Sequence, residues 1–105
     1  MSQILIRNAN LVDGTGAPAR PADVLVRDGR IAEVADAGSL AIEEGETIDA
    51  AGRLVTPGFV DVHTHYDGQV TWDPILTPSS WHGVTTVVMG NCGVGFAPAK
   101  PEPDK

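Results

Sequence analysis

The sequence predicts a mixed β and α/β fold, in which a small β region precedes the start of a parallel strand-helix-strand arrangement. Apolar and polar residues alternate between residues 4 and 34, which is the period of half-buried strands. The turn sequence Thr56-Pro57-Gly58 then marks a change of character. Beyond it, the run VTTVVM at residues 84–89 is rich in β-branched residues and apolar on both faces, which is typical of a parallel strand covered on both sides.

The first strands are expected to be short and antiparallel. Ile4 and Ile6 share one strand face, as do Val24 and Val26. An Asp-Gly pair at residues 28–29 separates VLVR from RIAEV, where a tight hairpin needs residues that tolerate positive φ. We therefore predict that these two segments pair directly.

The remainder of the β region consists of loops and two further strands. Residues 13–21 contain two glycines and two prolines, which suit an exposed connection. The acidic residues 38–46 are expected to form a loop or a poorly formed helix. Residues 47–55 resemble two more short strands around an Ala51-Gly52 turn. Together these elements predict part of a small β-sandwich or an open barrel.

The segment FVDVHTH at residues 59–65 has an unusual strand pattern. Asp61, His63 and His65 share one parity, so one face of the expected strand carries three polar side chains and cannot be an ordinary apolar core. A serine-capped short helix is expected to follow and to stop at Gly83, before the strand at residues 84–89. Strand, helix and strand in this order predict a parallel pair.

The expected organisation is therefore a β region at residues 1–56, a parallel unit at residues 57–97 and a flexible, proline-rich tail at residues 98–105. A chain of 105 residues has room for one ordinary domain. Trp72 and Trp81 are expected to pack against other residues.

Charge and composition limit the classes of partner. The formal net charge of −7 argues against a nucleic-acid or anionic-membrane surface, and leaves small molecules or protein as partners. The single cysteine, Cys92, excludes an internal disulfide, which fits a reducing compartment. The start lacks the features of a signal peptide, and no apolar run reaches membrane-spanning length. We expect a soluble, cytoplasmic protein.

The two histidines are candidate metal ligands. Being two positions apart on a strand, they project to the same side and can reach one ion, and neutral imidazole suits Zn²⁺ with an open position for water. An HxH triplet alone is a weak sign, because paired histidines on exposed strands are often inert. The position after an apolar strand strengthens it, since barrel enzymes build their active sites at such strand ends.

Other candidates follow from position. Cys92 lies past the second parallel strand, at the same end of the sheet as the histidines; its spacing alone favours a small buried thiol in a glycine-rich turn over a ligand. Asp61 suits either a hydrogen-bond partner of a ligand histidine or a polar floor residue. Asp67 and Asp73 lie where they can touch substrate or metal, although such carboxylates are usually solvated. His82, near a helix end, is not assigned to the metal.

Two segments carry a resemblance to a known family. TPGFVDVHTHYDGQ, after a small β region with DGRI, resembles the start of the amidohydrolase superfamily, and PSSWHGVTTVVMGNCGVGFAP resembles its N-acyl-D-amino-acid deacylase group, the D-aminoacylases. The resemblance covers essentially the whole chain. It implies a composite β-sandwich followed by the first β-α-β of a metal-dependent (β/α)8 barrel, truncated here. It also implies that His63, His65 and Cys92 bind one or two divalent ions, expected to be zinc, with cysteine replacing the carboxylated lysine of hydantoinases and dihydroorotases.

The activity implied by the resemblance is deacylation of N-acyl-D-amino acids by metal-activated water, with a carboxylate passing a proton to the leaving amine. The family pattern requires two more histidines and a catalytic aspartate beyond residue 105, so no catalytic acid or base is assigned within this chain. We therefore expect an N-terminal fragment that is inactive alone, and whose residues after about 56 pair with a neighbouring copy, swap or fray. The alternatives are a cyclic amidase and a non-catalytic β module.

Overall fold

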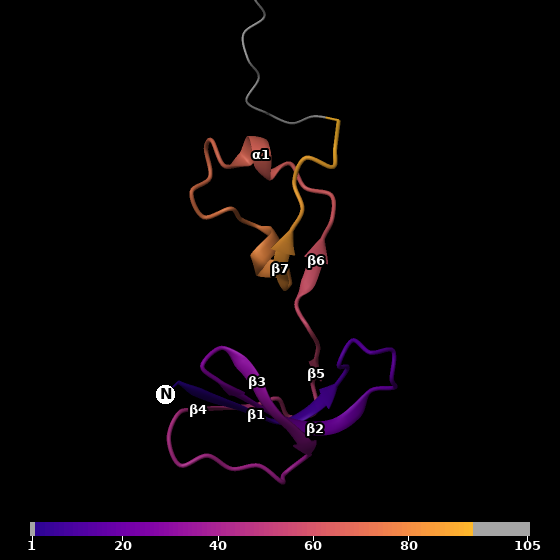
Figure 1. Ribbon diagram of the computed structural model, residues 1–105, viewed down its shortest axis with the longest axis vertical. Helices are drawn as coiled ribbons and strands as arrows, with labels where there is room; N and C mark the ends of the chain where they lie inside the picture. Colours follow the sequence, from indigo (N-terminus) through magenta and orange to yellow (C-terminus); the bar gives the residue numbers. More distant parts are fainter. Residues whose placement is uncertain (1, 94–105) are drawn as a thin grey trace, which may run out of the picture. The chain divides into compact units, whose positions relative to one another are not determined.

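The computed structural model describes residues 2–93, which form two compact units that divide between Pro57 and Gly58 (Figure 1). The sequence places its boundary one residue earlier, at 56/57. The expected tail at residues 98–105 lies outside the described residues. None of the described helices is long and apolar enough to cross a membrane.

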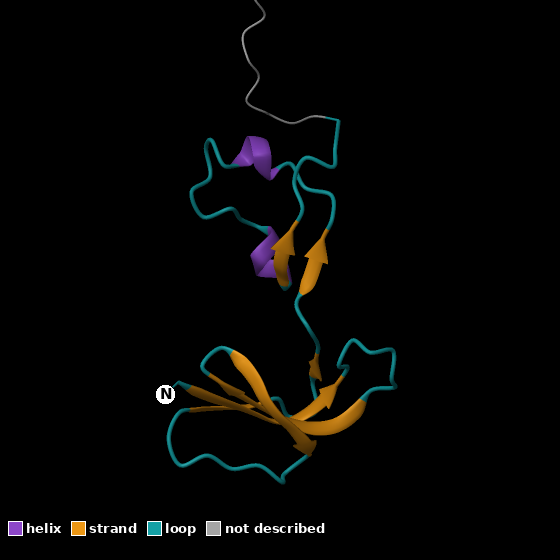
Figure 2. Cartoon of the chain, in the orientation of Figure 1, coloured by secondary structure: helices purple, strands orange, loops and turns teal. Residues whose placement is uncertain are grey.

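The first unit is built on one mixed sheet of five strands (Figure 2). The strands run in the order β3-β2-β1-β4, and β5 also pairs with β1. Their bounds are β1 (Gln3–Leu11), β2 (Arg20–Arg27), β3 (Arg30–Asp36), β4 (Glu46–Asp49) and β5 (Leu54–Val55). Residues 13–19 and 37–45 form the connections expected to be loops.

The hairpin between β2 and β3 confirms the prediction made from its turn. Asp28 and Gly29 have φ values of 48° and 76°, and they link the antiparallel pair Arg27 and Arg30. Two successive positive φ values give the turn a twist that matches that of the flanking strands. The side chain of Asp28 also accepts a hydrogen bond from the Ser2 backbone N–H at 3.1 Å, which ties the turn to the neighbouring strand.

The first three strands pair antiparallel as predicted, and β4 and β5 are the two further strands expected at residues 47–55, whose direction the sequence left open. Both run parallel to β1 and lie successively along its edge. Between them the chain turns at Ala51 and Gly52, with φ values of 49° and 77°. Opposite this turn, Asn8 takes a φ of 55° in a bulge of β1, and its carbonyl accepts the Gly52 N–H at 2.8 Å. The turn thus interrupts one edge rather than reversing the chain.

One face of this sheet is closed by the loop at residues 37–45. Leu5, Leu25 and Asp23 lie on this face, with 1%, 3% and 0% of their surfaces exposed. The Asp23 carboxylate accepts the backbone N–H groups of Gly38 and Leu40 at 2.9 and 3.2 Å, and that of Asn8 at 2.9 Å. A buried carboxylate therefore joins the loop to the bulge in β1.

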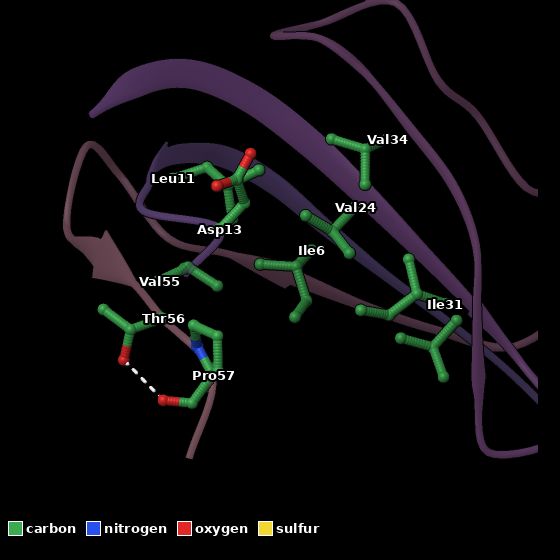
Figure 3. A pocket seen from close by; sticks show the side chains of 10 residues that line it. Ile6, Leu11, Asp13, Val24, Ile31, Val34, Val55, Thr56 and Pro57 are labelled. Carbon is green, nitrogen blue, oxygen red and sulfur yellow. Dashed lines mark hydrogen bonds between the residues drawn. The ribbon is translucent and has the colours of Figure 1, made fainter. Parts of the chain in front are cut away.

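The opposite face holds an apolar hollow of about 190 Å³ (Figure 3). Leu11 and Val24 are the buried residues that line it, and Ile31, which also lines it, remains 70% exposed. An open apolar face is the part of a sandwich that a second sheet covers. The described residues contain no second sheet in this unit, so the predicted sandwich is observed as one layer.

The second unit contains the predicted parallel strands, β6 (Phe59–Asp61) and β7 (Val84–Val87). The connection contains α1 (Tyr66–Gln69), which the sequence did not predict, and the 3₁₀ helix η1 (Ser79–His82). The predicted stop at Gly83 is confirmed by its left-handed φ of 81°. The serine cap is wrong, because Pro78 precedes the helix and no side chain caps it.

Two expectations for these strands are corrected. The second strand ends at Val87 rather than Met89, and it is not covered on both sides within the described residues, where Thr85 and Thr86 are exposed. Phe59 and Val60 expose 61% and 58% of their surfaces. Trp72 and Trp81 do not pack as expected, with 71% and 75% exposed. An apolar parallel pair is stable only when other elements cover its faces.

Candidate metal centre

His63 and His65 lie in the segment directly after β6. The predicted strand face is corrected here, because β6 ends at Asp61, His63 lies in a bend and His65 directly precedes α1 (Tyr66–Gln69). The Asp61 carboxylate accepts the His63 backbone N–H at 3.1 Å, a local bond that competes with strand pairing. The two imidazoles nevertheless lie side by side, with ring centroids 5.9 Å apart and planes inclined by 17°. The spacing of two residues therefore still directs both rings to one side.

Cys92 joins the two histidines from the segment after β7. One ligand atom from each of the three residues lies within 4.8 Å of the other two. Because β6 and β7 are parallel, their following segments leave the same edge of the sheet, as the sequence indicates. The structure brings together the three residues, and their binding of metal stays a prediction.

His63, His65 and Cys92, called the donor set from here on, suit zinc in the type of their ligand atoms and in the spacing between them. Imidazole nitrogen and thiolate sulfur are both preferred zinc ligands, and a tetrahedral ion holds such atoms about 3.3 to 3.6 Å apart. The observed limit of 4.8 Å is wider by about one ångström, which small side-chain rotations can close. Both histidines are exposed and Cys92 is half-buried, so the group is open to solvent on one side.

The remaining candidates do not belong to this group. Asp61 is committed to the His63 backbone by the bond described above, and its predicted contact with a ligand imidazole stays a prediction. His82 lies in η1, immediately before the start of β7 and therefore at the other end of that strand. Asp67 lies in α1 and is half-buried. None of these is a member of the close donor set.

Asp73 organises the loop between the two helices. Its carboxylate accepts the backbone N–H groups of Ile75 and Thr77, at 3.0 and 2.8 Å, and a hydrogen bond from the Gln69 amide at 2.9 Å. The Gln69 hydrogen bond is the largest cause holding the pKa of Asp73 below its ordinary value, and the bonds from Ile75 and Thr77 act in the same direction. These bonds give Asp73 a structural role.

Sequence reasoning missed two polar residues that link the segments carrying the donor set. Thr64 lies between the histidines and is 6% exposed, and its hydroxyl donates to the Val88 carbonyl at 2.9 Å. Asn91 precedes Cys92, and its amide donates to the Val62 carbonyl at 2.8 Å. Both partners lie more than 20 residues away in the chain, so no local pattern marks these residues.

Comparison with known proteins identifies relatives of this chain. The chain is 45% identical over 98 residues to the N-acyl-D-aspartate deacylase of Alcaligenes xylosoxydans xylosoxydans, covering 92% of this chain and 19% of that protein. It is 42% identical over 92 residues to the dihydroorotase of Streptococcus pneumoniae, covering 82% and 21%. The crystal structure of N-acyl-D-glutamate deacylase from Bordetella bronchiseptica, complexed with zinc and a phosphonate inhibitor, is 47% identical and superposes with a TM-score of 0.77.

That superposition covers 91% of this chain and 20% of the deacylase chain, so the present residues span about a fifth of the length of these relatives. The matched stretch extends through both units and spans the positions of His63, His65 and Cys92. A model of the amidohydrolase family matches residues 46–104, which is more than half of the chain. From the donor set, the parallel strand pair and these matches, we conclude that the chain belongs to the amidohydrolase family.

Proposed function

We propose that this chain supplies the first metal ligands of a zinc-dependent hydrolase that removes the acyl group from N-acyl-D-amino acids. The observation that carries the proposal is the convergence of His63, His65 and Cys92, whose donor atoms lie within 4.8 Å of one another. The similarity to deacylases of N-acyl-D-aspartate and N-acyl-D-glutamate supports the substrate class.

Each donor has a distinct part in holding the ion. The two neutral imidazoles contribute no charge, whereas the Cys92 thiolate contributes one negative charge and binds only after losing its proton. The three donors of this chain leave room at the ion for water and for the further histidines that the family pattern implies, and a position open to water distinguishes a catalytic from a structural zinc site. Bound zinc would polarise the amide carbonyl and lower the pKa of water.

The exposure of the histidines is consistent with a site that meets a small substrate. Both histidines are exposed, and the half-buried Cys92 lies in the segment after β7. The proposed fold of the whole protein is a composite β-sandwich with a (β/α)8 barrel that begins at β6. The open apolar face of the first unit and the uncovered strands of the second supply surfaces that such a fold requires to be covered.

A metal-binding assay on the purified chain tests the proposal. We expect wild type to bind one or more Zn²⁺ ions per chain, and His63→Ala and Cys92→Ala to weaken binding at least tenfold because each loses a direct ligand. His82→Ala is the matched control, since His82 is an exposed histidine outside the donor set. Affinity is measured by competition with a chromophoric chelator, and stoichiometry by elemental analysis.

The outcomes separate the proposal from its alternatives. Absence of binding by wild type, or equal binding by all variants, would favour a non-catalytic β module. Loss of binding in His63→Ala with full binding in Cys92→Ala would favour a cyclic amidase, a reading supported by the 42% identity to a dihydroorotase. Loss in both variants, with His82→Ala unchanged, supports the deacylase proposal.

A further inference from the structure

Backbone pairing between β6 and β7 ends before the proposed ligands begin. The Val88 backbone N–H donates to the Asp61 carbonyl at 2.8 Å, just after the last paired residues, Asp61 and Val87. His63 lies two residues beyond Asp61, and Cys92 lies four residues beyond Val88. The separation between the histidines and the thiol is therefore not fixed by the strand ladder itself.

Two side-chain hydrogen bonds continue the connection past the ladder. Thr64 donates its hydroxyl to the Val88 carbonyl at 2.9 Å, and Asn91 donates its amide to the Val62 carbonyl at 2.8 Å. The bonds are reciprocal, because each ligand-bearing segment supplies one donor and one acceptor. Each residue that donates one of these hydrogen bonds is adjacent in sequence to a proposed metal ligand: Thr64 lies between His63 and His65, and Asn91 precedes Cys92.

We propose that Thr64 and Asn91 are positioning residues, which set the distance between the histidine pair and Cys92 and so preorganise the metal centre. This inference rests on the proposed function, because it assigns these residues to the same site. Thr64 is nearly fully buried between two exposed histidines, so its side chain is directed to the protein while theirs are directed outward. Loss of either bond allows one segment to move away from the other. Binding of the ion must then also restrict that segment, and the entropy lost in doing so lowers the metal affinity.

The Thr64 bond is tested with variants of matched shape. Thr64→Val retains the volume but removes the donor, whereas Thr64→Ser retains the hydroxyl. Thr71→Val is the control, because Thr71 also donates its hydroxyl to a backbone carbonyl, that of Gly68 at 2.8 Å, but within its own turn. Asn91→Ala tests the second bond at an exposed residue, where loss of folding is less of a risk.

The probe is Co²⁺ added to the metal-free full chain. Its affinity reports preorganisation, and the near-ultraviolet thiolate-to-cobalt absorption reports whether the sulfur of Cys92 reaches the ion. We expect Thr64→Val and Asn91→Ala to weaken binding about 10- to 100-fold, the usual effect of losing residues that orient metal ligands. The thiolate band should weaken in both variants. Thr64→Ser should restore affinity and band, and Thr71→Val should match wild type.

Each outcome decides between the two proposals. Wild type that binds Co²⁺ with a thiolate band, together with Thr64→Val and Asn91→Ala variants that bind equally well, overturns the positioning role and leaves the metal centre standing. Wild type that binds no Co²⁺ overturns the metal centre and the positioning role together. Circular dichroism of each variant identifies any that do not fold. If Thr64→Val does not fold, the affinity and thiolate band of Asn91→Ala decide whether the positioning role stands.

Discussion

At the residue scale, Asp23 is the polar group on which the first unit depends most. Burial by itself raises the pKa of this carboxyl, but hydrogen bonds from the backbone N–H groups of Asn8, Gly38 and Leu40 outweigh it and hold the pKa below its ordinary value of 3.8. Buried charge is tolerated only when such donors surround it. The hydrogen bonds that offset the burial of Asp23 also link the bulge in β1 to the loop at residues 37–45.

Replacing Asp23 by asparagine tests this link. Asp23→Asn keeps the shape, but its amide nitrogen replaces an acceptor and faces N–H donors, which leaves buried groups unpaired. We expect the free energy of unfolding to fall by about 2 kcal/mol, measured by urea denaturation at neutral pH. Glu33→Gln, which changes an exposed carboxylate on β3, is the control and should leave the stability close to that of wild type.

The difference in stability between wild type and Asp23→Asn is predicted to depend on pH. The pKa of Asp23 is lower in the folded chain than in the unfolded chain, so its contribution is complete above the unfolded value, near 3.8, and is lost as pH falls through the folded value. The stability difference between wild type and Asp23→Asn should therefore shrink below about pH 4. A difference that stayed constant down to the acid transition would contradict the hydrogen-bonded carboxylate.

The proposed ligands were accessible to sequence reasoning, while the residues that hold them were not. His63 and His65 were candidates because few residue types bind zinc and because the strand pattern directs both to one side. Cys92, whose spacing alone favours a buried thiol, was assigned to the metal only through the resemblance to the D-aminoacylases. Asp23, Thr64 and Asn91 act through partners 15, 24 and 29 residues away in the chain. A local pattern contains no information about such partners, and an aspartate in a strand reads as an ordinary surface residue.

At the element scale, the close approach of β6 and β7 depends on a glycine. A Cβ at Gly58 would overlap the side chain of Thr85, including its Cβ at 2.7 Å, so the segment leading into β6 can lie against β7 only without a side chain there. Gly58 is not in the left-handed region, and its requirement is therefore one of space. This contact aligns the start of the strand pair that leads to the donor set.

Gly58→Ala is expected to destabilise the second unit by about 1 to 3 kcal/mol, because the strands must separate to admit the methyl group. Urea denaturation followed by tryptophan fluorescence measures the effect, since both tryptophans lie in this unit. Gly93→Ala is the control, as a Cβ there meets no atom of the described residues within 4 Å. Equal midpoints for the two variants would argue against close packing of Gly58 on Thr85.

The elements differ in how far sequence predicts them. The hairpin at Asp28-Gly29 was predicted because its turn chemistry is local and decisive. The direction of β4 and β5 was not, because pairing parallel to β1 is decided by an edge more than 30 residues earlier in the chain. The four-residue helix α1 was missed for a similar reason: it is too short for helical periodicity to show, and it is fixed by contacts such as that of Tyr66 with the Leu76 carbonyl at 2.7 Å.

At the scale of the whole molecule, the described residues expose apolar surfaces of the kind that other elements cover in a sandwich or a barrel. The hollow on the first sheet and the exposed strands of the second unit are apolar, and the relatives that share this region are about five times longer. A (β/α)8 barrel needs about 250 residues, more than twice the length of this chain. The proposed activity therefore requires parts that these residues do not supply.

We accordingly predict that the 105-residue chain alone releases no amino acid from N-acetyl-D-glutamate or N-acetyl-D-aspartate, even when loaded with zinc. The three candidate ligands bring no general acid to the leaving amine, and proton transfer of this kind contributes about 10²- to 10⁴-fold to such reactions. Amine release is measured with a fluorogenic reagent, and Cys92→Ala serves as the background. Zinc-dependent release by wild type that is absent in Cys92→Ala would contradict the prediction.

The pairing of β4 and β5 with β1 also determines the order in which the strands of this sheet are expected to pair during synthesis. The meander of β1, β2 and β3 joins segments that are neighbours in the chain, whereas β4 must return to β1 across some 40 residues, so the meander is expected to form first. Every strand of that sheet precedes the first histidine of the donor set. A growing polypeptide can thus pair the five described strands of this sheet before the segment with the proposed ligands has been translated.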